Sequence, residues 1–185
     1  MKKMVVMLMM LLIVPAFIAP CSQPHDVIPG YEGTRLNPDF LADVEFVYGF
    51  MLACIQGDRE GMERYMHENY VLDGPGNGRF TREQEIQKWV NFAEQNDNAR
   101  LFNRIWYSWV VDETFGNPDL VGKWVVSWHN FSFRHKANGK EVSFPSHVAI
   151  RISDGKVDYI RHQYDQLCLF NQLGYRLLPP EPTEE

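Results

Sequence analysis

Three histidines in the second half of the chain are the residues best suited to acid–base chemistry. His129, His147 and His162 each lie in a segment whose side chains alternate between apolar and polar, which is the pattern of a β-strand. The alternation puts His162 on the same strand face as Ile160 and Tyr164, which are both bulky. An imidazole in that setting either makes a structural hydrogen bond in the core or lines a pocket.

Turn sequences predict how the strands that carry these histidines pair. A two-residue Asp-Gly turn at 154–155 sets a register that puts His147 opposite His162. A three-residue loop over 137–139 puts His129 opposite His147. The two registers together would place three imidazoles in a row, which is a donor set for a metal ion.

Pro145 opens a second register. Because proline cannot donate to a sheet ladder, a bulge is expected near it, and one extra residue would turn His147 outward and bring Ser146 inward. His129 and His162 can share a face in either register. We therefore prefer this pair to the three-histidine site, and we expect no bound metal.

Two imidazoles in one apolar pocket can divide the work of proton transfer. Burial lowers the pKa of one, which then acts as a base, and a carboxylate such as Asp73 favours the protonated form of the other. This arrangement suits proton abstraction next to a carbonyl or elimination of water. His162, His129 and Asp73 are therefore the catalytic candidates, although an aspartate before Gly-Pro is more often a turn residue that bonds its own backbone. The expected wall of the pocket consists of Tyr164, Ile160, Phe131, Trp89 and His147.

The order of the elements indicates the fold class. Apolar residues at helical spacing run through 38–56 and 81–96, and the second helix opens with Thr81 and Gln84 at capping-box spacing. Strand patterns separated by turn sequences fill the second half of the chain. Helices first and antiparallel hairpins afterwards are typical of an α+β domain, which we place at residues 38–178.

Residues 1–20 resemble a bacterial secretory signal, because two lysines precede an apolar run that is too short for a transmembrane helix. Cys21 stands where an exported lipoprotein carries its acyl chains, although Pro20 is unusual before such a cysteine. A tether at 21–37 and a polar tail at 179–185 flank the domain. We expect an exported protein, periplasmic or lipid-anchored at the cell envelope, that meets the membrane only through its signal or anchor.

Several short motifs carry a family resemblance. "GDREGMERYMHENYVLDGP", the Gly-Lys hairpin and the closing "QLGY" have the order and spacing of the nuclear transport factor 2-like superfamily. Within it, the domain resembles the SnoaL-like polyketide cyclases and the limonene epoxide hydrolases. The resemblance implies N-terminal helices packed in a cone against a strongly curved, mixed but mainly antiparallel β-sheet that encloses a mostly apolar pocket. It also implies that His162 replaces the catalytic aspartate of the epoxide hydrolases, and that His129 and Phe131 replace their Arg-x-Asp pair, so that reaction is not expected.

Charge and missing motifs narrow the function further. Without Lys2 and Lys3 the chain has 16 basic and 24 acidic side chains, a net charge of -8, and no basic cluster follows the leader, which argues against a nucleic-acid partner. No phosphate loop, nucleophile elbow or zinc-protease motif is present, and no cofactor is expected. The expected partners are a small hydrophobic ligand and a second copy of the chain, since tryptophans on both strand faces would leave an apolar outer sheet surface. The sequence thus indicates either a cofactor-free lyase, isomerase or cyclase, or a non-catalytic binding or interaction module.

Overall fold

The computed structural model describes residues 32–176 and 178, so the predicted leader, Cys21 and the polar tail lie outside the described residues. Short 3-10 turns at Pro75–Asn77, Glu113–Phe115 and Pro118–Leu120 join some of the regular elements. No helix in this part of the chain is long and apolar enough to cross a membrane. The regular elements are β1 (Thr34–Leu36), α1 (Phe40–Gln56), α2 (Arg59–Tyr65), β2 (Met66–Asp73), β3 (Arg79–Thr81), α3 (Arg82–Gln95), β4 (Asn96–Val111), β5 (Gly122–His135), β6 (Glu141–Ser153), β7 (Lys156–Tyr164) and α4 (Gln166–Leu173).

The strands form one seven-stranded sheet in the order β1-β4-β5-β6-β7-β2-β3. Strands β2 and β7 run parallel, and the other neighbours run antiparallel. The predicted α+β class and the mixed, mainly antiparallel sheet are therefore confirmed. Residues 34–36 belong to the segment predicted as a tether, but they form strand β1, because they pair with the end of β4.

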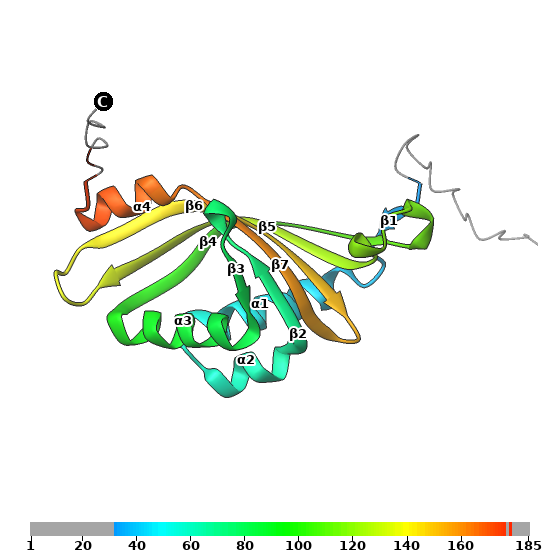
Figure 1. Ribbon diagram of the computed structural model, residues 1–185, viewed down its shortest axis with the longest axis horizontal. Coiled ribbons are helices and arrows are strands. Elements are labelled where there is room, and N and C mark those ends of the chain that lie inside the picture. The colour runs from blue at the N-terminus through cyan, green and yellow to red at the C-terminus, as the bar shows by residue number, and fades with distance from the viewer. Residues whose placement is uncertain (1–31, 177, 179–185) are drawn as a thin grey trace, which may run out of the picture.

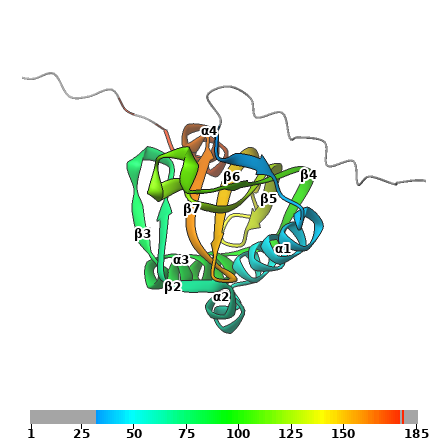
Figure 2. The same cartoon turned by 90° about the vertical axis from the view of Figure 1, so that its right-hand side faces the viewer.

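Two bulges in β4 help to curve the sheet. Asn98 and Asn103 have left-handed backbone angles, with φ of 54° and 52°, and the register with β5 shifts by one residue at each place. Asparagine tolerates this conformation better than most residues, and an extra residue in one strand bends it. Figures 1 and 2 show the result: α1, α2 and α3 gather on one side of the curved sheet, and α4 lies beside the far end of β6.

Helix α3 begins at a well-formed N-terminus. The Thr81 hydroxyl accepts a hydrogen bond from the Gln84 backbone N–H, and the Gln84 side chain accepts one from the Thr81 N–H, which is the predicted capping box. The helix then packs its Ile86 into a core shared with α1 and the sheet. A second apolar cluster forms around Phe131, Phe133 and Phe144 under α4. Trp89 of α3 packs against both clusters and so connects them.

Candidate functional site

The register of the central strands decides which histidines face the interior. Residues directly opposite each other share a face, and Val148 lies opposite His162, while Ser146 lies opposite both His129 and Tyr164. His129 and His162 therefore share the inner face, and Ser146 joins them. The prediction that His147 lies opposite both of them is wrong.

Two local features cause this difference. The loop between β5 and β6 contains four residues, 136–139, because the His135 N–H bonds the Lys140 carbonyl. Strand β7 carries one extra residue at Asp158, where the register with β6 shifts. No shift occurs at Pro145, which pairs regularly with Asn130. The predicted bulge is therefore in β7 rather than beside the proline.

His147 consequently lies on the outer face of the sheet. Its ring stacks on Trp128 with a centroid distance of 4.7 Å. A row of three inward imidazoles does not form, and no group of three or more potential metal ligands occurs within residues 32–176 and 178. His147 is not part of the pocket wall.

Each inward histidine is paired with a serine. Ser146 Oγ lies 2.8 Å from His162 Nε2, and Ser127 Oγ lies 3.0 Å from His129 Nδ1. Burial lowers the pKa of His162 to about 3, with smaller contributions from Lys88 and the other two imidazoles. Burial also lowers the pKa of His129 to about 4. Both rings are therefore neutral near pH 7, and the predicted division into one neutral and one protonated imidazole does not hold.

Asp73 lies on the other face of the sheet. It pairs with Arg161 in the parallel register of β2 and β7, and both have the parity opposite to His162. Its carboxylate accepts a hydrogen bond of 2.7 Å from the Tyr159 hydroxyl and lies 3.9 Å from Arg79. Its side-chain contacts are thus with Tyr159 and Arg79 and not with the inward imidazoles, although Asp73 and His162 both line a shallow pocket between β2 and β7.

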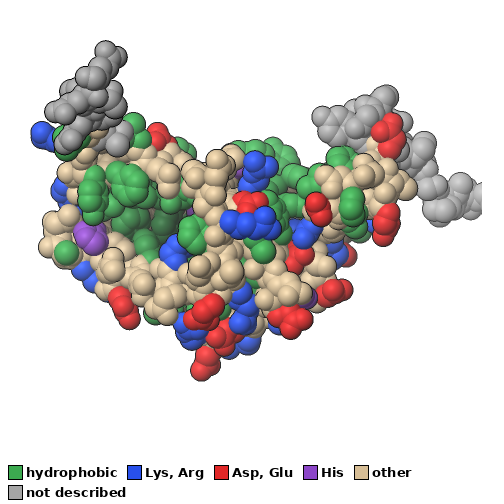
Figure 3. Space-filling model, viewed as in Figure 1, with side chains coloured by type: hydrophobic (Ala, Val, Ile, Leu, Met, Phe, Trp, Pro, Cys, Tyr) green, Lys and Arg blue, Asp and Glu red, His purple; other side chains and the backbone are tan. Residues whose placement is uncertain are grey.

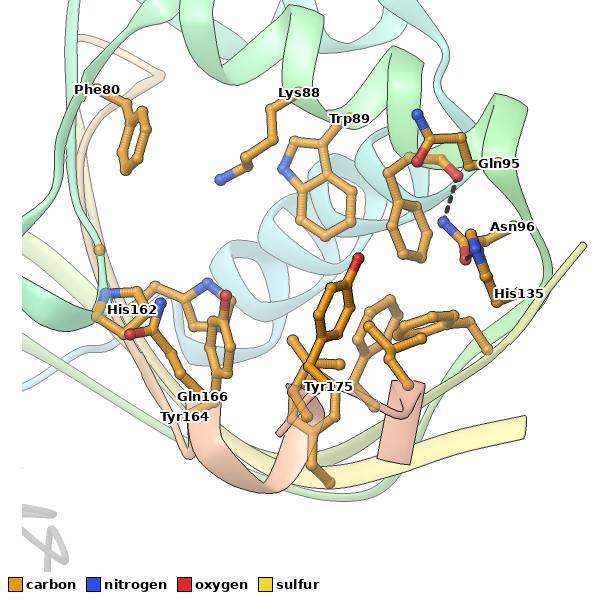
Figure 4. Close-up of a pocket in the computed structure, with 18 of the residues that line it drawn as sticks. Phe80, Lys88, Trp89, Gln95, Asn96, His135, His162, Tyr164, Gln166 and Tyr175 are labelled. Atoms are coloured by element: carbon orange, nitrogen blue, oxygen red, sulfur yellow. Dashed lines mark hydrogen bonds between the residues drawn. The ribbon is translucent and has the colours of Figure 1, made fainter. Parts of the chain in front are cut away.

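A cavity of about 480 Å³ opens between α3, the inner sheet face and α4. Figure 3 shows it as a hollow walled mostly by hydrophobic side chains. In Figure 4, Lys88 and Trp89 extend from α3 on one side, and His162 and Tyr164 face them from β7. The apolar wall consists of Leu72, Phe80, Trp89, Phe92, Phe131, Phe133, Phe144, Leu169 and Leu173. Three of the predicted wall residues, Trp89, Phe131 and Tyr164, line this cavity, which we call the main cavity because of its apolar wall.

A smaller space of about 50 Å³ lies deeper in the cone. His162 and Trp89 line both spaces, whereas His129, Ser146 and the predicted wall residue Ile160 line only the deeper one. A space of this size holds a water molecule or a small chemical group. His162 therefore stands at the junction of the two spaces.

Helix α3 also contributes a charged pair that the sequence analysis missed. Glu85 is 1% exposed and lines the deeper space, while Lys88 forms an ion pair with it and lines the main cavity. The Trp89 indole N–H donates a 2.7 Å hydrogen bond to Glu85. Glu85, Trp89 and Phe92 are spaced i, i+4 and i+7, which is one helical face, and this spacing could have revealed Glu85 as an inward residue.

Sequence comparisons identify no relatives of this chain. No model of a protein family matches it. No curated protein matches it either.

Comparison with solved structures shows the fold. A protein from Xanthomonas campestris, described as a candidate polyketide cyclase, is 13% identical, with a TM-score of 0.58 over 74% of this chain and 99% of that one. IdmH from Streptomyces antibioticus, also described as a candidate polyketide cyclase, is 15% identical, with a TM-score of 0.54 over 71% and 98%. An epoxide hydrolase-like protein from M. tuberculosis is 12% identical, with a TM-score of 0.53 over 74% and 92%. The chain therefore has the nuclear transport factor 2-like fold predicted from its sequence, and its chemistry must be argued from its own residues.

Proposed function

We propose that this chain binds a small, mostly apolar molecule in the main cavity between α3, the sheet and α4. The observation that carries the proposal is the cavity itself. Its volume of about 480 Å³ lies in the usual range for small-molecule sites, and its wall is mostly aromatic and aliphatic, as in such sites. Its polar side chains include Lys88, His162 and Tyr164, which come from two facing elements. A few polar groups in an apolar cavity fix the orientation of a ligand.

The same polar groups support a catalytic role as a cofactor-free lyase, isomerase or cyclase. The neutral imidazole of His162 can accept the proton that leaves the carbon next to a carbonyl, and Lys88 adds a positive charge beside it. Burial raises the pKa of Tyr164, so its hydroxyl stays a donor near neutral pH. With the proton on His162, Lys88 and Tyr164 would stabilise the negative charge that develops on the carbonyl oxygen.

A non-catalytic binding module is the second candidate, and the low pKa of His162 favours it. An imidazole with a pKa of about 3 accepts a proton poorly near pH 7, and its Nε2 is already in contact with Ser146. In that case His162 serves only as a polar contact for the ligand, and Ser146 holds the imidazole in place.

Native mass spectrometry of the purified protein tests the binding proposal. We expect a co-purified molecule of a few hundred daltons, or saturable uptake of an added apolar probe such as 2-naphthamide. A Leu169→Trp variant, which adds bulk to the cavity wall under α4, should lose this binding while remaining folded by circular dichroism. Equal binding by the variant would contradict the proposed location.

Hydrogen exchange in a ketone separates the two candidates. The enzyme candidate predicts that the protein accelerates exchange of the acidic C1 protons of 2-tetralone in D₂O, followed by NMR, and that a His162→Gln variant loses most of this acceleration. Saturable binding of 2-tetralone without any acceleration would favour the non-catalytic module.

Export and lipidation are a separate proposal, and their support is the N-terminal sequence. We propose that residues 1–20 direct export from a bacterial cytoplasm and that Cys21 carries the anchor. Labelling with a radioactive fatty acid in the expressing bacterium should mark the wild type and not a Cys21→Ser variant. A wild-type protein that is found in the periplasm but is not labelled would support the proposed export and contradict the proposed lipid anchor.

We also propose that two copies pair through the outer face of the sheet. Ile105, Tyr107 and Trp128 are 55%, 53% and 46% exposed, and the Tyr107 and Trp128 rings contact each other edge to face. An exposed apolar patch of this kind commonly marks an interface. Light scattering should give twice the chain mass for the wild type and the single mass for a Trp128→Lys variant. A monomeric wild type at micromolar concentration would contradict the pairing.

A further inference from the structure

The main cavity is distinguished by the charge of its lining. Of the described residues that line it, Lys88 is the one that carries a full charge near neutral pH, because the rest are apolar, small, amide, tyrosine or histidine side chains. No aspartate, glutamate or arginine is among them. A cavity whose only full charge is positive favours an electronegative group on an otherwise apolar ligand.

The surroundings of Lys88 hold its ammonium group at this wall. Its Nζ lies 5.1 Å from the centroid of the Phe80 ring and 5.7 Å from that of Trp89. Attraction to the ring faces adds to the ion pair with Glu85, which comes from the preceding turn of the same helix. An ammonium has three N–H donors, and Glu85 is its single ionic partner among the described residues. Donors therefore remain for a ligand.

Glu85 does not make this wall negative. Its side chain is almost completely buried and lines the deeper space rather than the main cavity. The Trp89 indole N–H bonds one carboxylate oxygen, and Lys88 pairs with the other. A ligand in the main cavity thus meets the lysine, while the glutamate charge is held behind it.

We propose that Lys88 forms a head-group site for a carboxylate on an otherwise apolar ligand, whose body packs against Phe92, Phe131 and Phe133. This inference rests on the proposed binding function and specifies its ligand class as an amphipathic carboxylic acid. The partial exposure of the Lys88 side chain, 43%, lets a bound carboxylate keep part of its hydration, which limits the cost of moving its charge out of water. The aromatic cluster beside it supplies the apolar contact.

A matched pair of probes tests the site by isothermal titration calorimetry at pH 7. 2-Naphthoate and 2-naphthamide have nearly the same shape, and only the first is charged. The wild type should bind naphthoate at least tenfold more tightly than naphthamide. A Lys88→Met variant should bind the two probes about equally.

The control is a Lys156→Met variant, which makes the same change in net charge at the β6–β7 hairpin, where Lys156 bonds the Arg64 carbonyl. It should keep the preference for naphthoate. Equal binding of both probes by the wild type, or a preference that survives in the Lys88→Met variant, would overturn the inference and leave the binding function intact. Failure of both probes to bind the wild type would instead contradict the binding function itself. Equal binding of the two probes by the wild type overturns the inference even if the Lys88→Met variant does not fold.

Discussion

The two buried neutral histidines should make the fold markedly less stable as the pH falls from 7 to 5. An unfolded histidine has a pKa of about 6.5. In the folded chain the pKa is about 3 for His162 and about 4 for His129. The unfolded state therefore binds more protons in this window, so the free energy of unfolding rises with pH and is lost as the pH drops below about 6.5.

The size of the effect follows from these values. At pH 5 an unfolded histidine is almost fully protonated, while both folded rings remain mostly neutral. The linkage relation then gives a loss of about 2 kcal/mol for each histidine between pH 7 and pH 5. With a typical urea dependence of about 2 kcal/mol per molar, the urea midpoint falls by roughly 1 M for each one.

Urea denaturation followed by tryptophan fluorescence at pH 5, 6 and 7 measures this loss. A His162→Gln variant can still bond the Ser146 hydroxyl but does not titrate, so about half of the pH dependence should disappear. The further change His129→Gln should remove most of the rest. A His67→Gln variant, which changes a histidine that lines neither space, serves as the control. A wild-type midpoint that stays constant from pH 7 to pH 5, or a double variant that loses as much stability as the wild type, would refute the reasoning.

Three further predictions follow from single contacts. Thr81→Ala removes the N-terminal cap of α3 and should lower the free energy of unfolding by about 1 kcal/mol, measured by urea denaturation. Asp73→Asn should leave the affinity for 2-naphthamide within twofold of wild type, because Asp73 bonds Tyr159 on the outer sheet face; a tenfold loss would place Asp73 in the site after all. Ser146→Ala removes the hydroxyl that contacts His162 and should cost about 1 kcal/mol of stability while 2-naphthamide still binds; an unchanged stability would argue that this hydrogen bond is absent in solution.

The fold could be predicted largely because its signals are local. The capping box of α3 and the helices before the hairpins are set by nearby residues, and they appear as expected. It could also be predicted that His129 and His162 share a face of the sheet. Side chains alternate within each strand, and the two changes of register together leave both histidines on the same face.

The partner of each histidine could not be predicted, because it depends on register over a long distance. One additional loop residue at 136–139 and one extra residue at Asp158 each move the pairing by one position. A shift of one residue turns a strand to its other face, so Ser146 replaced His147 in the interior. Neither the bulge nor the loop length has a distinctive sequence pattern.

The charged pair of α3 was missed for a different reason. Charged residues on a helix normally face solvent, so Glu85 and Lys88 were not among the expected pocket residues. In the structure the buried Glu85 accepts a hydrogen bond from the Trp89 indole and forms an ion pair with Lys88. That compensation exists only once the helix has packed against the sheet.

Occupancy of the main cavity by a small apolar molecule is tested most directly by an NMR titration of ¹⁵N-labelled protein with 2-naphthamide. We predict saturable shifts of the Trp89 indole N–H, which lies at the cavity wall, and of backbone amides in β7 and α4. The Trp128 indole N–H, on the outer face of the sheet, should not move. Shifts confined to Trp128 and its neighbours, or no saturable shift at millimolar probe, would contradict a binding site inside the cone.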